Sequence, residues 1–233
     1  MITEETLPDA EAVARRAAQV IAHAARAAVD ARGRFLLATS GGATPWLMLR
    51  HLAQENVPWE RVHLFQVDER VAPEGHPDRN WTHLCESLLA HVATPAAGLH
   101  AMPVGDLDLS HAAASYAAIL RAEAGEPPVL DLVHLGLGED GHTASLVPND
   151  SALDVTTADV AATAPYAGRQ RLTLTFPAIN RARRIVWIVT GAGKAPALAM
   201  LRRGDGAIPA GRIRRHDALL LSDAAANCAS LAS

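Results

Sequence analysis

The sequence predicts an α/β protein with a mostly parallel sheet covered by helices on both faces. Segments with strand patterns alternate with segments of helical periodicity along nearly all of the 233 residues. The predicted strands are near-continuous apolar runs, which are typical of parallel strands buried on both faces. Hydrophobic residues make up 49% of the chain, and no long linker or internal repeat divides it. We therefore expect a single domain over residues 1–233.

The first half of the chain contains clear helix boundaries. Apolar residues recur at helical spacing over residues 9–31, between Asp9, a good N-cap, and Gly33, a good helix stop. A short buried strand over residues 35–39 follows, and Thr44 is expected to cap the next helix. The remaining elements expected here are that helix to residue 54, a strand at 62–67, a helix at 81–91, a short strand at 99–102 and a helix at 110–124.

The second half continues the alternation with one irregular stretch. Strands are expected at residues 130–137, 155–162, 171–176, 184–190 and 218–221, with a helix from 194 to 203. Residues 148–170 depart from the simple pattern. We expect antiparallel strands in this region.

Composition and charge exclude several classes of protein. The net charge of −4 does not favour binding to nucleic acid or to an anionic membrane. The first eight residues are acidic and lack the apolar core of a secretory signal, and no apolar run reaches the roughly 20 residues that span a bilayer. Cys85 and Cys228 match no metal spacing. We expect two free thiols and a cytoplasmic location.

Two strand ends carry residues suited to ligand binding, and ligands of open parallel sheets bind at the carboxyl ends of strands. Residues 40–45 read Ser-Gly-Gly-Ala-Thr-Pro and precede a helix, whose free N–H groups favour phosphate. An ordinary tight turn is the alternative. Residues 68–70 read Asp-Glu-Arg directly after an apolar strand. These charges indicate a functional site, although a solvated loop is the alternative.

A third strand end places a histidine in a glycine-rich loop. Residues 136–142 read Gly-Leu-Gly-Glu-Asp-Gly-His and fit the dinucleotide pattern G-x-G-x-x-G. We reject that interpretation because Pro148 arrives too soon for the full helix that the pattern should open. The loop is better interpreted as holding His142 at the sheet edge, where it can accept a proton from water near neutral pH. A structural histidine in a turn is the alternative.

The fourth set consists of two cations late in the chain. Arg171 can bind phosphate oxygens in a bidentate manner. Lys194 follows Gly191-Ala192-Gly193 at a predicted helix start and is the only lysine, against twenty arginines. It is not a P-loop lysine, because the pattern lacks its first glycine and its final Ser or Thr. A lone lysine at a helix N-terminus suggests a specific role.

Together these segments resemble the 6-phosphogluconolactonases, which are grouped with the glucosamine-6-phosphate deaminases. The resemblance extends from about residue 10 to 225, and its most specific part is residues 140–146, Asp-Gly-His-Thr-Ala-Ser-Leu. It implies a Rossmann-like three-layer α/β/α sandwich with a few additional antiparallel strands. It also implies hydrolysis of 6-phospho-D-glucono-1,5-lactone to 6-phospho-D-gluconate in the pentose phosphate pathway.

The resemblance also implies roles for individual residues. His142 matches the general base, and Asp140 or Asp68 is expected to orient the imidazole or the water. Position 79 is Arg where Ser is more usual, so no role is assigned to it. The residues expected to bind substrate, chiefly its phosphate, are Ser40, Gly41, Gly42, Thr44, Arg70, Asn80, Arg171 and Lys194. The expected partner is the phosphorylated sugar lactone, bound by a monomer or weak homodimer. Because a lactone is an activated ester and no ligand cluster appears in the sequence, we expect neither metal nor cofactor.

Two alternative functions remain at this stage. A glucosamine-6-phosphate deaminase carries a catalytic Glu a few residues after the histidine, whereas residues 143–148 here read Thr-Ala-Ser-Leu-Val-Pro. That difference argues against amine chemistry. A non-catalytic sugar-phosphate sensor would keep the cations and could dispense with the base, but His142 and Asp68 are both present.

Overall fold

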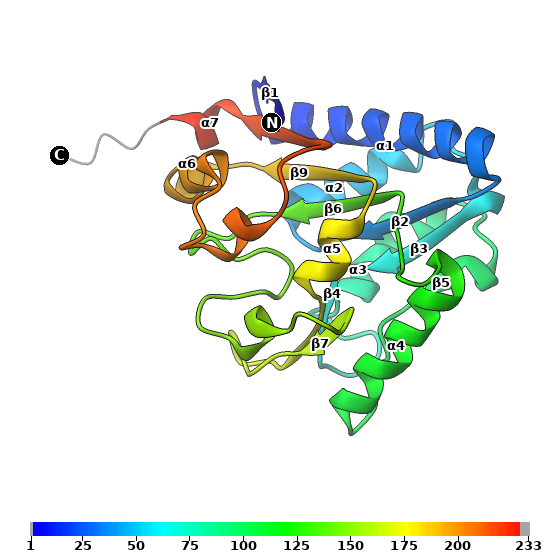
Figure 1. Cartoon of the computed structure of the whole chain (residues 1–233). Helices are drawn as coiled ribbons and strands as arrows, with labels where there is room; N and C mark the ends of the chain where they lie inside the picture. Colours follow the sequence, from blue (N-terminus) through cyan, green and yellow to red (C-terminus); the bar gives the residue numbers. More distant parts are fainter. Residues whose placement is uncertain (1, 229–233) are drawn as a thin grey trace.

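The computed structural model describes residues 2–228, so residue 1 and residues 229–233 of the predicted domain lie outside the described residues. Within this range the strands form a seven-stranded parallel sheet and a separate three-stranded antiparallel sheet (Figure 1). The predicted fold class is therefore confirmed. In spatial order the large sheet consists of β1 (Thr3–Leu7), β10 (Ala218–Asp223), β9 (Arg184–Val189), β6 (Leu132–Gly136), β2 (Phe35–Thr39), β3 (Val62–Gln66) and β5 (Leu99–His100).

Helices cover both faces of this sheet, because successive residues of its strands point to opposite sides. Phe35 and Leu37 of β2 pack with one group of helices, whereas Leu36 and Ala38 pack with the other. The first group is α1 (Ala10–Arg32), α2 (Ala43–Leu52) and α3 (Asn80–Ser87). The second is α4 (Leu109–Ala124), α5 (Phe176–Arg181), α6 (Ala195–Arg203) and the short α7 (Ala224–Asn227). No helix within residues 2–228 has the length and apolar character needed to cross a bilayer.

The caps of α1 are those predicted, but the predicted cap of α2 is wrong. Asp9 accepts a hydrogen bond from the Ala12 N–H (2.8 Å), and Gly33 ends the helix in the left-handed region at φ 75°. Helix α2 instead begins after Gly42, with no side chain capping it. The Thr44 hydroxyl bonds to the Thr190 hydroxyl (2.7 Å). The N–H groups of this helix end are thus left free of a side-chain cap, which matters for the site.

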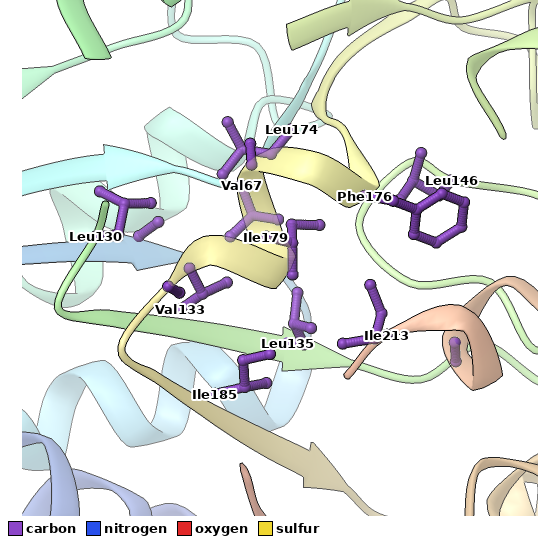
Figure 2. Packing of buried hydrophobic residues seen from close by; sticks show 14 of the residues in the cluster. Val67, Leu130, Val133, Leu135, Leu146, Leu174, Phe176, Ile179, Ile185 and Ile213 are labelled. Atoms are coloured by element: carbon purple, nitrogen blue, oxygen red, sulfur yellow. The ribbon is translucent and has the colours of Figure 1, made fainter. Parts of the chain in front are cut away.

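The small sheet consists of β4 (Asp68–Arg70), β8 (Arg171–Leu174) and β7 (Val160–Ala162), paired antiparallel. Of the antiparallel strands expected within residues 148–170, one is present, β7. Helix α5 joins this sheet to the large one: Ile179 lies between Leu174 of β8 and Leu135 of β6 (Figure 2). The position of β4 and β8 relative to the strand ends of the large sheet therefore depends on a shared apolar core.

Several predicted boundaries are wrong. The strand expected at residues 155–162 is confined to 160–162. It is preceded by a 3-10 helix, Ser151–Asp154, which Asp150 caps by accepting the Ala152 N–H. The strand expected at 171–176 ends at Leu174, because α5 begins at Phe176. The strand expected at 99–102 ends at His100, since the Met102 N–H donates to the Gln66 side chain instead of a strand. Three further elements, β1, β4 and α5, have no counterpart among those predicted from the sequence.

Candidate active site

A cavity of about 330 Å³ opens where β2, β3, β6 and β9 end. From β2 the chain adds β3 and β5 on one side, and it then crosses to β6 on the other side of β2. The strand order thus reverses between β2 and β6, and open parallel sheets bind ligands at such a switch point. Of the residues predicted for the site, Asp140 alone does not line the cavity wall. The lining includes Ser40, Gly41, Gly42, Thr44, Asp68, Arg70, Asn80, His142, Arg171 and Lys194.

The glycine loop after β2, residues 40–42, packs closely against neighbouring segments and leads into the N-terminus of α2. A Cβ on Gly41 would lie 2.1 Å from Oδ1 of Asn80, so only glycine fits there. Gly42 has φ 135°, a conformation that other residues rarely adopt. The Ser40 hydroxyl donates to the His134 carbonyl (3.0 Å) and thus fixes the loop to β6. The N-terminus of α2 consequently faces the cavity as a ready site for an anion.

The Asp-Glu-Arg segment forms strand β4, and its middle residue, Glu69, links this strand to the start of α3. Glu69 is fully buried and accepts hydrogen bonds from the backbone N–H groups of Asn80 (2.7 Å) and Trp81 (2.9 Å) at the start of α3. It also forms an ion pair with Arg79, at 3.1 Å between Nε and Oε2. Sequence reasoning assigned no role to Glu69 or Arg79. The only signal was that three charges at a buried strand end need partners.

Asp68 and Arg70 lie on either side of Glu69 in the chain, and both line the cavity. Oδ2 of Asp68 accepts a hydrogen bond from the Ser145 hydroxyl (2.6 Å), and Asn80 Nδ2 donates to the Asp68 carbonyl (2.9 Å). Arg70 donates to the Asp78 carbonyl (2.9 Å). Asp68 is only 4% exposed, and the hydrogen bond from Ser145 fixes the position of its carboxylate. Ser145 is a second residue that sequence reasoning left without a role.

His142 is held by the loop that carries it. Its Nδ1 lies 2.6 Å from Oδ1 of Asp140, and its backbone N–H donates to the same oxygen (3.1 Å). A Cβ on Gly138 would lie 2.1 Å from that Nδ1, so the loop needs glycine to let the ring approach. With Nδ1 hydrogen-bonded to a carboxylate, the neutral ring keeps its proton there and leaves Nε2 free to act as a base.

Asp140 is in turn fixed by Tyr166, which the sequence analysis did not select. The Tyr166 hydroxyl donates to Oδ2 of Asp140 (3.1 Å), and its ring packs edge-on against His142 with centroids 5.5 Å apart. Partial burial opposes ionisation of Asp140, but the hydrogen bonds from His142 and Tyr166 and the charge of His142 outweigh it and lower its pKa. Asp140 therefore remains a carboxylate at neutral pH, the form that orients the imidazole.

Two cations reach the cavity from different elements, Arg171 from strand β8 and Lys194 from the start of α6. Arg171, on β8, is buried, lies over the Tyr166 ring (5.0 Å) and contacts the Ser145 hydroxyl (3.4 Å). Burial lowers its pKa, an effect that the nearby Asp68 charge opposes, but an arginine stays charged throughout the physiological range. Lys194 lies at the start of α6 and forms no ion pair within residues 2–228. With Arg70, these side chains place three positive charges around one carboxylate, which favours an anionic ligand.

Comparison with known proteins shows the family to which this chain belongs. The family model described as glucosamine-6-phosphate isomerases/6-phosphogluconolactonase matches residues 8–221. The chain belongs to this family. A 6-phosphogluconolactonase from a Nostoc strain is 38% identical over 232 residues, covering 96% of each chain, and one from Mycobacterium tuberculosis is 37% identical, covering 94% of each. The crystal structure of a Thermotoga maritima 6-phosphogluconolactonase superposes with a TM-score of 0.85 at 25% identity, covering 95% of this chain and 98% of that one.

The match to the glucosamine-6-phosphate isomerase/6-phosphogluconolactonase family agrees with the fold, but the description of this family names two activities. What separates them is the set of groups around His142. Within residues 2–228, Asp68 is the one carboxylate side chain that lines the cavity. Of the three residues after His142, Thr143 bonds to the Gly136 carbonyl (2.9 Å) and Ser145 bonds to Asp68, so this segment serves to hold the site.

Proposed function

We propose that this protein hydrolyses 6-phospho-D-glucono-1,5-lactone to 6-phospho-D-gluconate, in the oxidative branch of the pentose phosphate pathway. The observation that carries the proposal is a histidine oriented by a carboxylate in a cavity that also exposes three cations. A base beside a phosphate-sized anion site suits attack of water on an ester within a phosphorylated sugar. The named relatives, which are 6-phosphogluconolactonases, support the same choice.

In this reaction His142 acts as the general base. Nε2 removes a proton from water as the water oxygen bonds to the lactone carbonyl carbon. The bond between that carbon and the ring oxygen then breaks, and the protonated His142 returns the proton to the ring oxygen. Asp140 keeps the imidazole in the required tautomer and stabilises its positive charge, while Tyr166 fixes Asp140. The attack therefore needs neither metal nor cofactor.

The phosphate is held by Arg171, Lys194 and the N-terminus of α2, all of which border the cavity. Arg171 is pre-positioned by Tyr166 and Ser145, so little side-chain entropy is lost on binding. The developing oxyanion needs hydrogen-bond donors, and Arg70 or backbone N–H groups of the glycine loops supply them. Asp68 and Asn80 then contact the sugar hydroxyls or the attacking water. Fixing both ends of the substrate places the carbonyl carbon against His142.

We propose further that the whole chain works as one domain, in the cytoplasm, as a monomer or weak homodimer. Cys85 and Cys228 are free thiols, which supports a reducing compartment. Sedimentation of the purified chain at several concentrations tests the assembly. A tight higher oligomer would contradict the proposal.

A coupled assay on freshly generated lactone, read through formation of 6-phosphogluconate, tests the activity. We expect turnover well above spontaneous hydrolysis, and a fall in kcat of roughly a hundredfold or more in His142→Ala because the base is lost. Arg171→Ala should mainly raise KM, because it removes a phosphate contact. Arg15→Ala is the matched control, since Arg15 pairs with Glu11 on the exposed side of α1.

Three outcomes would contradict parts of this proposal. Binding of 6-phosphogluconate without turnover would identify a sensor instead of an enzyme. Release of ammonia from glucosamine 6-phosphate would identify a deaminase. Near-normal turnover of His142→Ala would remove that residue from the role of base, and an unchanged KM in Arg171→Ala would remove Arg171 from the phosphate site.

A further inference from the structure

Two imidazoles and a carboxylate meet at the edge of the large sheet, outside the candidate active site. They are His63 near the amino end of β3, His100 at the end of β5 and Glu123 in the last turn of α4. None of the three lines the cavity. That cavity borders Asp68, which follows the carboxyl end of β3, so this cluster lies toward the opposite end of the strand.

The strand register explains why residues so distant in sequence converge. Phe65 of β3 lies opposite His100 of β5, and His63 shares the sheet face of Phe65 because it is two residues away. Helix α4 covers this face through Leu120, and Glu123, three residues on, lies on the same side of the helix. The His100 ring stacks on Phe65 with centroids 4.4 Å apart, which limits its movement. The three ligand atoms are thus supplied by two strands and a helix with fixed packing.

The spacing of these atoms fits a tetrahedral metal ion. Nδ1 of His63 lies 3.4 Å from Nε2 of His100 and 3.2 Å from Oε2 of Glu123, and all three atoms lie within 4.8 Å of one another. A tetrahedral zinc ion, with bonds of roughly 2.0–2.1 Å, separates its ligand atoms by about 3.3 Å. Small rotations of the side chains are enough to bring the third pair to the same separation.

Nδ1 of His63 faces two groups of the cluster, Nε2 of His100 and Oε2 of Glu123. A protonated Nδ1 of His63 can donate to Glu123 or to His100, but its single proton cannot serve both. An unprotonated Nδ1 would face the carboxylate with two lone pairs in opposition. A cation at the centre attracts all three groups at once. Arg34 lies 3.9 Å from Oε2 of Glu123, which is at the outer limit of an ion pair.

We propose that His63, His100 and Glu123 bind a divalent transition-metal ion of the zinc class, with water at the fourth position. Two imidazoles and a carboxylate are ligands that zinc accepts, and they disfavour calcium and magnesium, which prefer oxygen. The ion would tie β5, an edge strand of two residues, to β3 and α4. It would stabilise this edge of the sheet and take no part in lactone hydrolysis. This cluster is not apparent in the sequence, because the three residues are far apart in the chain.

Titration of the chelator-treated full chain with ZnCl2, followed by calorimetry, tests this site, with the visible absorption of bound Co2+ as a second readout. We expect one ion per chain with tetrahedral absorption, and a rise in Tm on binding. His63→Ala and Glu123→Ala should each weaken binding by more than about tenfold, because losing a direct ligand costs at least as much as losing an outer contact. Either variant is sufficient if the other fails to fold.

His51→Ala is the matched control, because His51 pairs with the carboxylate of Glu11 at 2.8 Å and belongs to no potential metal-binding group among residues 2–228. This variant should bind zinc like the wild-type chain. The proposal is overturned if the wild-type chain binds zinc no better than His63→Ala, or if His51→Ala loses binding equally. Loss of binding in His142→Ala, with His63→Ala unaffected, would also overturn it, since the ion would then occupy the cavity.

Discussion

At the scale of single residues, Asp140 does two jobs with one carboxylate: Oδ1 holds His142, and Oδ2 accepts the Tyr166 hydroxyl. Asp140→Asn removes the charge that stabilises the imidazolium and allows the wrong tautomer. We expect kcat to fall by more than about tenfold with little change in KM. Tyr166→Phe removes one hydrogen bond, worth about 1 kcal/mol, so its kcat should fall only about fivefold. Equal losses in the two variants, measured by steady-state kinetics, would contradict this order.

His134 predicts how stability depends on pH. This residue is fully buried in β6, its Nδ1 accepts the Ser40 N–H (3.3 Å), and burial lowers its pKa from 6.5 to about 3. Between these values the unfolded chain binds a proton that the folded chain excludes, so stability is full above pH 6.5 and is lost as pH falls toward 3. His134 should contribute a slope of about 1.4 kcal/mol per pH unit in this window. Urea unfolding at pH 4.5–7.5 measures it.

His134→Asn is the comparison for that slope. Its amide oxygen can accept the Ser40 N–H, but it has no group that titrates in this range. In the variant, the free energy of unfolding should fall less steeply with decreasing pH than in the wild-type chain, by about 1.4 kcal/mol per pH unit. If the free energy of unfolding depended on pH in the same way in both proteins, a group other than His134 would control the loss of stability in acid.

Some residues of the candidate site can be recognised from a local sequence pattern, and others cannot. His142, Lys194 and the glycine loops stand at strand ends with unusual neighbours, and the structure brings them into one cavity. Glu69, Ser145 and Tyr166 were not predicted, because their importance depends on partners from distant segments. Tyr166, for example, reaches Asp140 and Arg171 from a loop with no pattern of its own. Local sequence shows which groups can react, whereas the groups that hold them appear only after folding.

At the scale of elements, the same limit applies to short strands. The long helices and apolar strands were predicted from their periodicity. Strand β1 was missed because Thr-Glu-Glu-Thr-Leu is polar and pairs only at the edge, with β10. Strand β4 was missed because three charges disfavour a strand unless, like Glu69, they meet buried donors. Helix α5 was missed because six residues are too few for a periodic pattern.

The turn between β2 and α2 provides a prediction at this scale. A Cβ at Gly41 would collide with Asn80 at the start of α3, so the two elements must separate or the side chain must move. Gly41→Ala should lower the free energy of unfolding by about 1–3 kcal/mol, as overpacking does, and raise KM because the anion-binding turn shifts. Gly105→Ala is the matched control, since nothing lies within 4 Å of its added Cβ. Denaturant unfolding and steady-state kinetics measure both effects. If the two variants had the same free energy of unfolding and the same KM, the prediction would be wrong.

At the scale of the whole molecule, the site forms because the large and the small sheet are held in a fixed position relative to each other. The large sheet supplies the glycine loops and Lys194, while the small sheet supplies Asp68, Arg70 and Arg171. Helix α5 fills the space between the sheets with apolar side chains (Figure 2). A ligand that spans the cavity contacts both layers. Its binding should therefore stabilise the whole fold and not one loop.

This coupling predicts a thermal shift with the product, which binds without being consumed. At a concentration of 100 times Kd, 6-phosphogluconate should stabilise the folded chain by about 2.7 kcal/mol. For a chain of this size, that gain should raise Tm by roughly 5–10 °C. Gluconate at the same concentration lacks the phosphate and should give a much smaller shift. Arg171→Ala and Lys194→Ala should each reduce the shift with 6-phosphogluconate, whereas Arg15→Ala should not. An equal shift with gluconate would mean that the cations of the cavity do not recognise the phosphate.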